Sequence, residues 1–322
     1  MNKKILNLAI PNIISNISIP LLGIVDMALM GHLESDAYIG AIALGSLIFN
    51  FIYWSLGFLR MGTSGFTAQA RGRRDLKEAI LVFSRAAFIA IVMSLILLVL
   101  QGPIESLSFL VLKGEPRVEE LAMTYFRIRV WAAPAALGQF ALLGFFLGMQ
   151  NARFPMVVLV LTNVINVIFN FFFVMKLGMG SDGVALGTVI AQYSGLITAL
   201  IILRKYYGKL FKYWSLKATI QWDKLKYFLL INRDIFIRTM CLVVVFSIFT
   251  ARSASVDLQN AGDETILAVN SILMQFFMFF SFLIDGFAHA SEALTGKFIG
   301  ARDRPSLVRS IRLLFFWGTG IS

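Results

Sequence analysis

Long stretches without a charged residue limit, more than any other feature, what this chain can fold into. A helix rises about 1.5 Å per residue, so roughly 20 residues cross the roughly 30 Å of hydrocarbon in a bilayer. Windows of that length without Asp, Glu, Lys or Arg occupy residues 5–25, 37–59, 86–104, 130–152, 154–175, 183–203 and 265–284. A less clean window runs from about residue 235 to residue 251, with Arg238 in its first turns. The sequence therefore predicts an all-α polytopic membrane protein, with spans one to eight in chain order.

The composition excludes an ordinary water-soluble fold. Apolar residues make up 58% of the 322 residues and charged residues only 15%, whereas soluble domains carry about 45–50% and about 25%. The single cysteine, Cys241, excludes a disulfide framework, and two histidines leave little material for a metal centre. The sequence contains no H-E-x-x-H, P-loop or nucleophile-elbow motif, so we expect no enzyme and no cofactor other than a coupling ion.

Basic residues collect in every second connection between the predicted spans. The basic connections are the N-terminus and those after spans two, four, six and eight, with Lys3, Arg73, Arg153, Lys205 and Arg302 among their cations. The connections between them are acidic, with Glu34, Glu119, Asp182 and Asp263 among their anions. Positive charge marks the cytoplasmic side, so the pattern predicts a multi-pass protein of a bacterial inner membrane with a cytoplasmic N-terminus.

The segment 207–226 separates two groups of spans. It mixes lysines with tyrosine, phenylalanine and tryptophan, as nucleic-acid sites and membrane-interface segments both do. Its place between two spans favours the interface, so we expect no nucleic-acid partner. The chain is then an N-terminal six-helix lobe at 1–206, this cytoplasmic linker, and the beginning of a second lobe at 227–322. A last apolar stretch from about Leu313 is too short to cross, so we expect truncation within the third helix of the second lobe.

A short repeat relates the two lobes. Span two is followed by Gly72-Arg73-Arg74-Asp75, and span eight by Gly300-Ala301-Arg302-Asp303. Both sequences enter a basic connection on the same predicted side of the membrane. Since the two spans are six apart, the pattern predicts parallel repeats that are related by an axis along the membrane normal.

Asp26 is the first candidate for chemistry. An ionisable group near the end of an apolar span costs several kcal/mol, roughly 2.5–3.5 at a helix centre, unless it is paired or hydrated. Pro11 and Pro20 in the same span each remove a backbone donor and free a carbonyl one turn back. These prolines favour a proton-binding or cation-binding role for Asp26 over a position in the outer interface.

Amide side chains in span five form a second group of candidates. Asn163, Asn166 and Asn170 share one helix face because they are spaced i, i+3 and i+7. Thr188 lies early in span six, at a similar predicted depth. These groups make ordinary interhelical hydrogen bonds, or Asn166, Asn170 and Thr188 line one cavity together with Asp26.

A charged group lies near the cytoplasmic ends of spans seven and eight. Its members are Arg233, Asp234 and Arg238 on span seven and Asp285, His289 and Glu292 on span eight. The helical spacing suggests an ion-pair network between the two spans, with Asp234 and Arg238 as an i, i+4 pair, or alternatively a transport site. Arg60 on span two is a further intramembrane charge, and the sequence does not identify its partner.

The residues together resemble a known family. The resemblance extends over Ile10-Pro11, Val25–Leu33, Gly57–Thr63, Ala68-Gln69-Ala70, Gly148–Asn151, Gly183–Thr188, Arg233–Thr239 and Asp285–Ala288. These segments resemble multidrug and toxic compound extrusion (MATE) transporters, specifically the branch typified by DNA-damage-inducible protein F (DinF). Together they cover essentially the whole chain.

The resemblance implies twelve helices in two pseudo-symmetric six-helix lobes and no enzymatic activity. It implies a monomeric antiporter in the lipid bilayer, in which proton or sodium entry drives the efflux of small organic cations or amphipathic compounds. Carried over by residue, Asp26 corresponds to the cation-site acid of the first helix, and Asn166 and Thr188 to its polar partners. Asp285 corresponds to an acid of the second lobe that is typical of this branch.

Asn170 departs from the family pattern, because this position is commonly Asp in the family. A first-lobe site would then hold one formal negative charge rather than two. Sodium prefers several strongly negative oxygen ligands, so the departure favours protonation of Asp26. The alternatives are a lipid-linked oligosaccharide flippase of the same superfamily, which predicts a central cavity rich in Arg and Lys, and a membrane protein that does not transport.

Overall fold

The computed structural model describes residues 1–30, 37–112, 115–259 and 265–321, and this part contains helices and turns but no strand. Within its helices, the side chains of residues 24, 26–28, 30, 247, 250–259, 265–268, 271, 272, 275 and 321 lie outside the description. The all-α architecture is the one that the charge-free windows predict.

The helices follow one another with short connections. The first lobe comprises α1 (Asn2–Met30), α2 (Ala37–Leu56), α3 (Phe58–Gly72), α4 (Leu76–Val99), α5 (Gln101–Val111), α6 (Pro116–Arg129), the 3₁₀ turn η1 (Val130–Ala132), α7 (Ala133–Gly148), α8 (Arg153–Phe171), the π turn η2 (Phe172–Lys176) and α9 (Ser181–Tyr207). The remaining elements are η3 (Gly208–Tyr213), α10 (Leu216–Thr219), α11 (Trp222–Gln259), α12 (Thr265–Gly300) and α13 (Arg304–Ile321).

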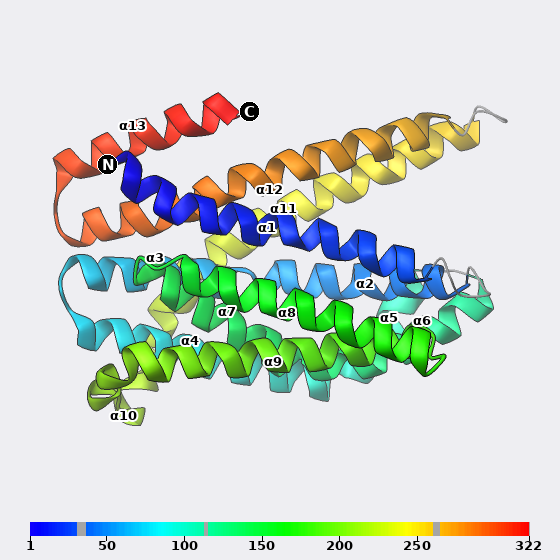
Figure 1. Ribbon diagram of the computed structural model, residues 1–322, viewed down its shortest axis with the longest axis horizontal. Helices are drawn as coiled ribbons and strands as arrows, with labels where there is room; N and C mark the ends of the chain where they lie inside the picture. Colours follow the sequence, from blue (N-terminus) through cyan, green and yellow to red (C-terminus); the bar gives the residue numbers. More distant parts are fainter. Residues whose placement is uncertain (31–36, 113–114, 260–264, 322) are drawn as a thin grey trace.

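Six described segments are long and apolar enough to cross a membrane, and they match predicted spans one to six. They are Asn2–Gly23, Ala37–Gly72, Leu76–Val99, Pro116–Gly148, Arg153–Lys176 and Ser181–Tyr213. Predicted spans seven and eight fall in α11 and α12, parts of which lie outside the described residues. Figure 1 places the α3–α4 turn, the α9–α10 connection and the α12–α13 turn at one end of the bundle, so basic connections share one end.

Two spans are longer than their charge-free windows. The window of span two ends at Leu59, yet after a turn at Gly57 the helix continues as α3 to Gly72, with Arg60 inside it. Span four likewise begins in the charged helix α6 and passes through η1 into α7. Pro134 lacks the N–H that would continue the helix, which explains the 3₁₀ turn before α7. Charge alone therefore marks the end of an apolar window but not the end of a helix.

Three helix–helix turns share one geometry. They are Gly72-Arg73-Arg74-Asp75, Gly148-Met149-Gln150-Asn151 and Gly300-Ala301-Arg302-Asp303, each between two antiparallel helices. The third residue of each has positive φ, at 60° for Arg74, 60° for Gln150 and 55° for Arg302, as in a left-handed helix C-cap. The first and last turns are the predicted repeat, and the middle turn adds a copy that the sequence comparison did not identify.

The fourth residue of each turn caps the next helix. Its side-chain oxygen accepts a backbone N–H three residues on, which satisfies one of the free donors of a helix N-terminus. The three bonds are Glu78 N–H to Asp75 at 2.9 Å, Phe154 N–H to Asn151 at 3.3 Å, and Ser306 N–H to Asp303 at 3.1 Å. The repeat between spans two and eight thus has a physical basis: the third residue of the turn takes a left-handed backbone conformation, and the fourth caps the next helix.

The predicted linker has structure of its own. Its 3₁₀ turn η3 and short helix α10 pack against α4, and α11 begins at Trp222 within the predicted range. The buried guanidinium of Arg85 on α4 donates to Glu78 at 2.7 Å and to the carbonyl oxygen of Ala218 at 3.4 Å. This contact joins α10 to the first lobe, while Trp214 and Trp222 remain exposed.

Candidate functional site

A directional chain of hydrogen bonds links α8 to α9. The side-chain amide of Asn170 donates to Asn166 Oδ1 at 2.9 Å, and Asn166 donates to Thr188 Oγ1 at 3.1 Å. The Thr188 hydroxyl in turn donates to the carbonyl oxygen of Val184 at 2.9 Å. Three of the four predicted site residues, Asn166, Asn170 and Thr188, are therefore joined in one network.

The chain lies in the interior of the first lobe. Asn166 is 3% exposed and Asn170 is fully buried. A Cβ at Gly187 of α9 would overlap the Asn170 side-chain oxygen, so only glycine leaves room for this amide. A buried amide that lacks a hydrogen bond destabilises a fold, and the chain gives a partner to the side-chain amide nitrogens of Asn166 and Asn170 and to the side-chain oxygen of Asn166.

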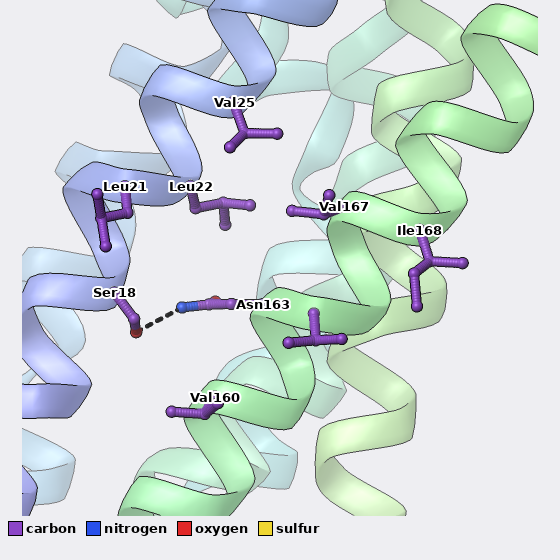
Figure 2. A pocket seen from close by; sticks show the side chains of 9 residues that line it. Ser18, Leu21, Leu22, Val25, Val160, Asn163, Val167 and Ile168 are labelled. Carbon is purple, nitrogen blue, oxygen red and sulfur yellow. Dashed lines mark hydrogen bonds between the residues drawn. The ribbon is translucent and has the colours of Figure 1, made fainter.

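The α1 helix supplies the fourth predicted residue, Asp26, whose side chain lies outside the described residues. Its neighbour Val25 lines a hollow of about 280 Å³ between α1 and α8. Asn163, the third amide on the same face of span five, donates to Ser18 Oγ of α1 at 2.7 Å in this hollow (Figure 2). Asn163 therefore ties α1 to α8 and stands apart from the Asn170–Thr188 chain.

Sequence reasoning missed Gln139, the buried amide of α7. Its side chain donates to the carbonyl oxygen of Gln192 at 2.7 Å and to Gln192 Oε1 at 2.9 Å. Gln192 lies one turn after Thr188 on α9, so the polar interface continues from α8 across to α7. A glutamine inside a charge-free window was the available signal.

The partner of Arg60 is His289. Arg60 Nη2 lies 2.9 Å from His289 Nε2, which joins α3 of the first lobe to α12 of the second. His289 is 5% exposed. Arginine can only donate, so Nε2 accepts and the imidazole is neutral, with its proton on Nδ1.

Further charges surround this bond. Asp285 and Glu292 of α12 both interact electrostatically with Arg60. A cleft of about 380 Å³ between α3, α11 and α12 is lined by His289, Glu292 and Arg238, among others. The predicted charged group of the second lobe thus faces the first lobe through α3.

The remaining members of that group lie elsewhere than predicted. Asp234 pairs with its neighbour Arg233 at 3.4 Å, and both side chains are exposed. Arg238 reaches Met61 of α3, with Nη2 at 3.8 Å from the sulfur. Among the described side chains, the expected i, i+4 ion pair of Asp234 with Arg238 is replaced by these contacts, because Arg238 turns toward the cleft.

The MatE family model matches residues 11–172. The chain belongs to the MatE family. It is 36% identical over 307 residues to DNA damage-inducible protein F of Escherichia coli K12, and 30% identical over 230 residues to multidrug and toxin extrusion protein 1 of rabbit. These alignments cover 95% and 68% of this chain but 66% and 39% of the relatives.

Solved transporter structures share the fold of this chain. An outward-facing multidrug resistance MATE transporter superposes with a TM-score of 0.86 at 23% identity, covering 99% of this chain and 70% of that one. A MOP superfamily transporter from Pyrococcus furiosus gives a TM-score of 0.87 at 21% identity, over 99% of this chain and 69% of that one. The family match and the six apolar segments long enough to cross a membrane make this chain a multi-pass member of the MatE family.

Proposed function

We propose that the complete protein is a secondary active antiporter of a bacterial inner membrane. It exports small organic cations or amphipathic compounds in exchange for protons, with sodium as the alternative coupling ion. It works as a monomer with its N-terminus in the cytoplasm. Asp26 binds the coupling proton, and the neutral amide chain of the first lobe contributes to the same site.

The buried chain from Asn170 to Thr188 is the observation that carries this proposal. Its side chains are amides and a hydroxyl, which have no charge to balance a metal ion. A sodium site prefers several negative oxygens. A proton needs only one acid, whose exposure to water changes during the cycle so that it takes up and releases the proton. A neutral chain with a single acid on the adjacent helix suits proton coupling.

The hollow between α1 and α8 supports the substrate class. Its lining is Ser18, Leu21, Leu22, Val25, Val160, Asn163, Val164, Val167 and Ile168, without a charged side chain. A mostly apolar surface with a few polar groups suits an amphipathic compound. The phosphates of a lipid-linked oligosaccharide would instead require cations in the cavity.

The decisive experiment measures transport in everted membrane vesicles that contain the complete gene product. A fluorescent probe reports the proton gradient, and ethidium is added as an organic cation. We expect ethidium to discharge the gradient in the wild type and to have no effect in Asp26→Asn, because an amide cannot carry the proton. Asp182→Asn is the matched control, since Asp182 lies in the outer turn and accepts from the N–H of Gly180 at 2.9 Å.

Each other outcome contradicts part of the proposal. If Asp26→Asn still couples ethidium movement to the proton gradient, Asp26 is not the proton site. If only a sodium gradient moves the dye, the coupling ion is wrong. If no gradient moves dye in the wild type, organic-cation efflux is wrong and a flippase activity gains support.

A further inference from the structure

The bond between Arg60 and His289 crosses from one lobe to the other. In a rocking transporter, contacts between lobes must be made and broken during each cycle, whereas contacts within a lobe need not change. The groups that decide whether α3 stays against α12 are therefore candidates for control of that motion.

At their C-terminal ends, near Gly72 and Gly300, α3 and α12 are in backbone contact. A Cβ on Gly72 would overlap the carbonyl oxygen of Lys297, and a Cβ on Gly300 would overlap that of Gln69. Arg60 and His289 lie roughly 16–18 Å along the two helices from these glycines. Figure 1 shows α12 meeting α3 at this end and diverging from α2 toward the other. The polar bond thus sits where the two helices begin to separate.

His289 can hold this bond in one protonation state only. In the neutral imidazole, Nε2 accepts from the guanidinium of Arg60 at 2.9 Å. A proton on Nε2 removes that acceptor and places a second positive charge against the guanidinium. Protonation therefore converts an attraction between the lobes into a repulsion.

Charged groups of both signs lie near His289, and the acids among them can stabilise its protonated imidazole. Arg60 of α3 and Arg238 of α11 are the cations near His289, and Asp285 and Glu292 are the acids one turn away on α12. Of the other helices packed on α12, α7 has no charged residue, α1 places Lys4 near Lys297, and α13 carries the exposed Arg309 and Arg312. The cleft lined by His289 and Glu292 offers a hollow through which protons can reach the imidazole.

We propose that His289 is a second proton-binding site, whose neutral form latches α12 to Arg60 of α3 and whose protonation releases the two lobes from each other. The inference rests on the proposed antiport only for its place in the transport cycle. The latch itself is a property of the contact between α3 and α12.

Interlobe distances in the complete protein test the latch directly. Spin labels are placed at Lys77→Cys on α4 and Arg309→Cys on α13, both exposed positions, in a Cys241→Ser background within lipid nanodiscs. Electron–electron resonance then gives the label distance between about pH 8 and about pH 5. In the wild type we expect the population with the longer distance to grow severalfold as the pH falls.

Three substitutions separate the role of His289 from those of its neighbours. His289→Gln keeps a neutral acceptor for Arg60, so the short distance should persist at every pH. Glu292→Gln removes one of the two acids one turn from His289 and should leave the pH response in place. Arg60→Met removes the donor and should give the longer distance at every pH, with gel filtration and thermal unfolding confirming that each variant folds.

The contrary outcomes are equally specific. A wild-type distance that does not change with pH would overturn the latch, as would a response that persists in His289→Gln. A response lost in Glu292→Gln but kept in His289→Gln would assign the titration to Glu292. If the complete wild-type protein shows no proton-driven ethidium transport but its label distance still responds to pH, the proposed function is refuted and the latch is not.

Discussion

The polar groups between α8 and α9 differ in chemistry from those between α3 and α12. The first group consists of amides and a hydroxyl that are hydrogen-bonded to one another within one lobe, with Asn170 completely buried. The second consists of ionisable groups that meet between lobes, with His289 bonded to Arg60. Neutral amides give a bond that pH does not change, whereas an imidazole gives one that a proton can break.

The difference follows from what each interface must do. In the proposed antiporter, the α8–α9 interface holds the coupling site in shape throughout a cycle, so a bond independent of pH is an advantage. In the same proposal the α3–α12 interface must separate, and in hydrocarbon a bond that no ligand weakens would hold it shut. Substitutions that exchange the chemistry of the two sites can therefore test the comparison.

Asn166→Leu should have the largest effect on stability. It removes the acceptor of the Asn170 amide and the donor to Thr188, and each hydrogen bond lost at a buried polar group costs about 1–3 kcal/mol. We expect a loss of about 2–4 kcal/mol, measured by thermal or denaturant unfolding in detergent, and equal at pH 6 and pH 8, roughly the range where histidine titrates. Transport should fall at every pH, in contrast with the pH-selective effect of His289→Gln.

Thr162→Val is the matched control for this prediction. Thr162 is also buried on α8, but its hydroxyl donates only to the carbonyl oxygen of Val158 in the same helix, at 2.8 Å. Removing a bond within one helix leaves no group unpaired across α8 and α9, so the loss should be well under that of Asn166→Leu. Equal losses in both variants would mean that the interhelical chain contributes nothing beyond ordinary packing.

Asn170→Asp should make the stability of the α8–α9 interface depend on pH, as we expect for the contact between Arg60 and His289. A carboxylate there loses its solvation, so the folded state favours the neutral acid and stability should decline as the pH rises. Asn166 can turn its amide to donate to the new carboxylate, which limits the loss to about 1–3 kcal/mol at high pH. The measurement is the unfolding temperature against pH, with Asn163→Asp in the more open hollow as the control.

The same variant sharpens the ion assignment. Asn170→Asp gives the proposed first-lobe site a second formal negative charge in addition to that of Asp26, and strongly negative oxygens are what sodium prefers. We expect ethidium efflux in this variant to gain a dependence on the sodium gradient that the wild type lacks. An unchanged dependence on both gradients would show that charge number at this position does not select the ion.

The sequence could predict the network within one lobe but not the bond between lobes. Asn166 and Asn170 lie one turn apart, so helical periodicity alone brings them together. Arg60 and His289 are 229 residues apart, and no local pattern pairs them. The repeated Gly-x-x-Asp turn predicted that the ends of spans two and eight are alike. It did not predict that these ends touch, because that depends on glycines that let two backbones meet.

The sequence placed some helix ends wrongly for a related reason. Arg60 ended the charge-free window of span two, yet a buried partner allows a cation inside a membrane helix. Sequence pattern also gave the wrong partner for Arg238. Helical periodicity predicted an ion pair with Asp234, whereas in the structure the Arg238 side chain reaches Met61. Charge patterns locate the ends of the bundle well, while the partner of each intramembrane charge depends on packing between distant segments.

Asp303→Ala should give the smallest effect, and it tests the repeat in the two turns. Hydrogen bonds from the hydroxyl and backbone N–H of Ser306 hold the pKa of Asp303 below its ordinary value of 3.8. A lowered pKa in the folded state stabilises α13 above the unfolded-state value, and this contribution is lost as the pH falls through the folded-state value. The unfolding temperature should therefore drop slightly at neutral pH in Asp303→Ala, and the difference from wild type should shrink as the pH falls below 3.8. Asp75→Ala should also lower the unfolding temperature slightly at neutral pH, since Asp75 caps α4 at 2.9 Å; opposite signs in the two variants would mean that the turns are alike in backbone only.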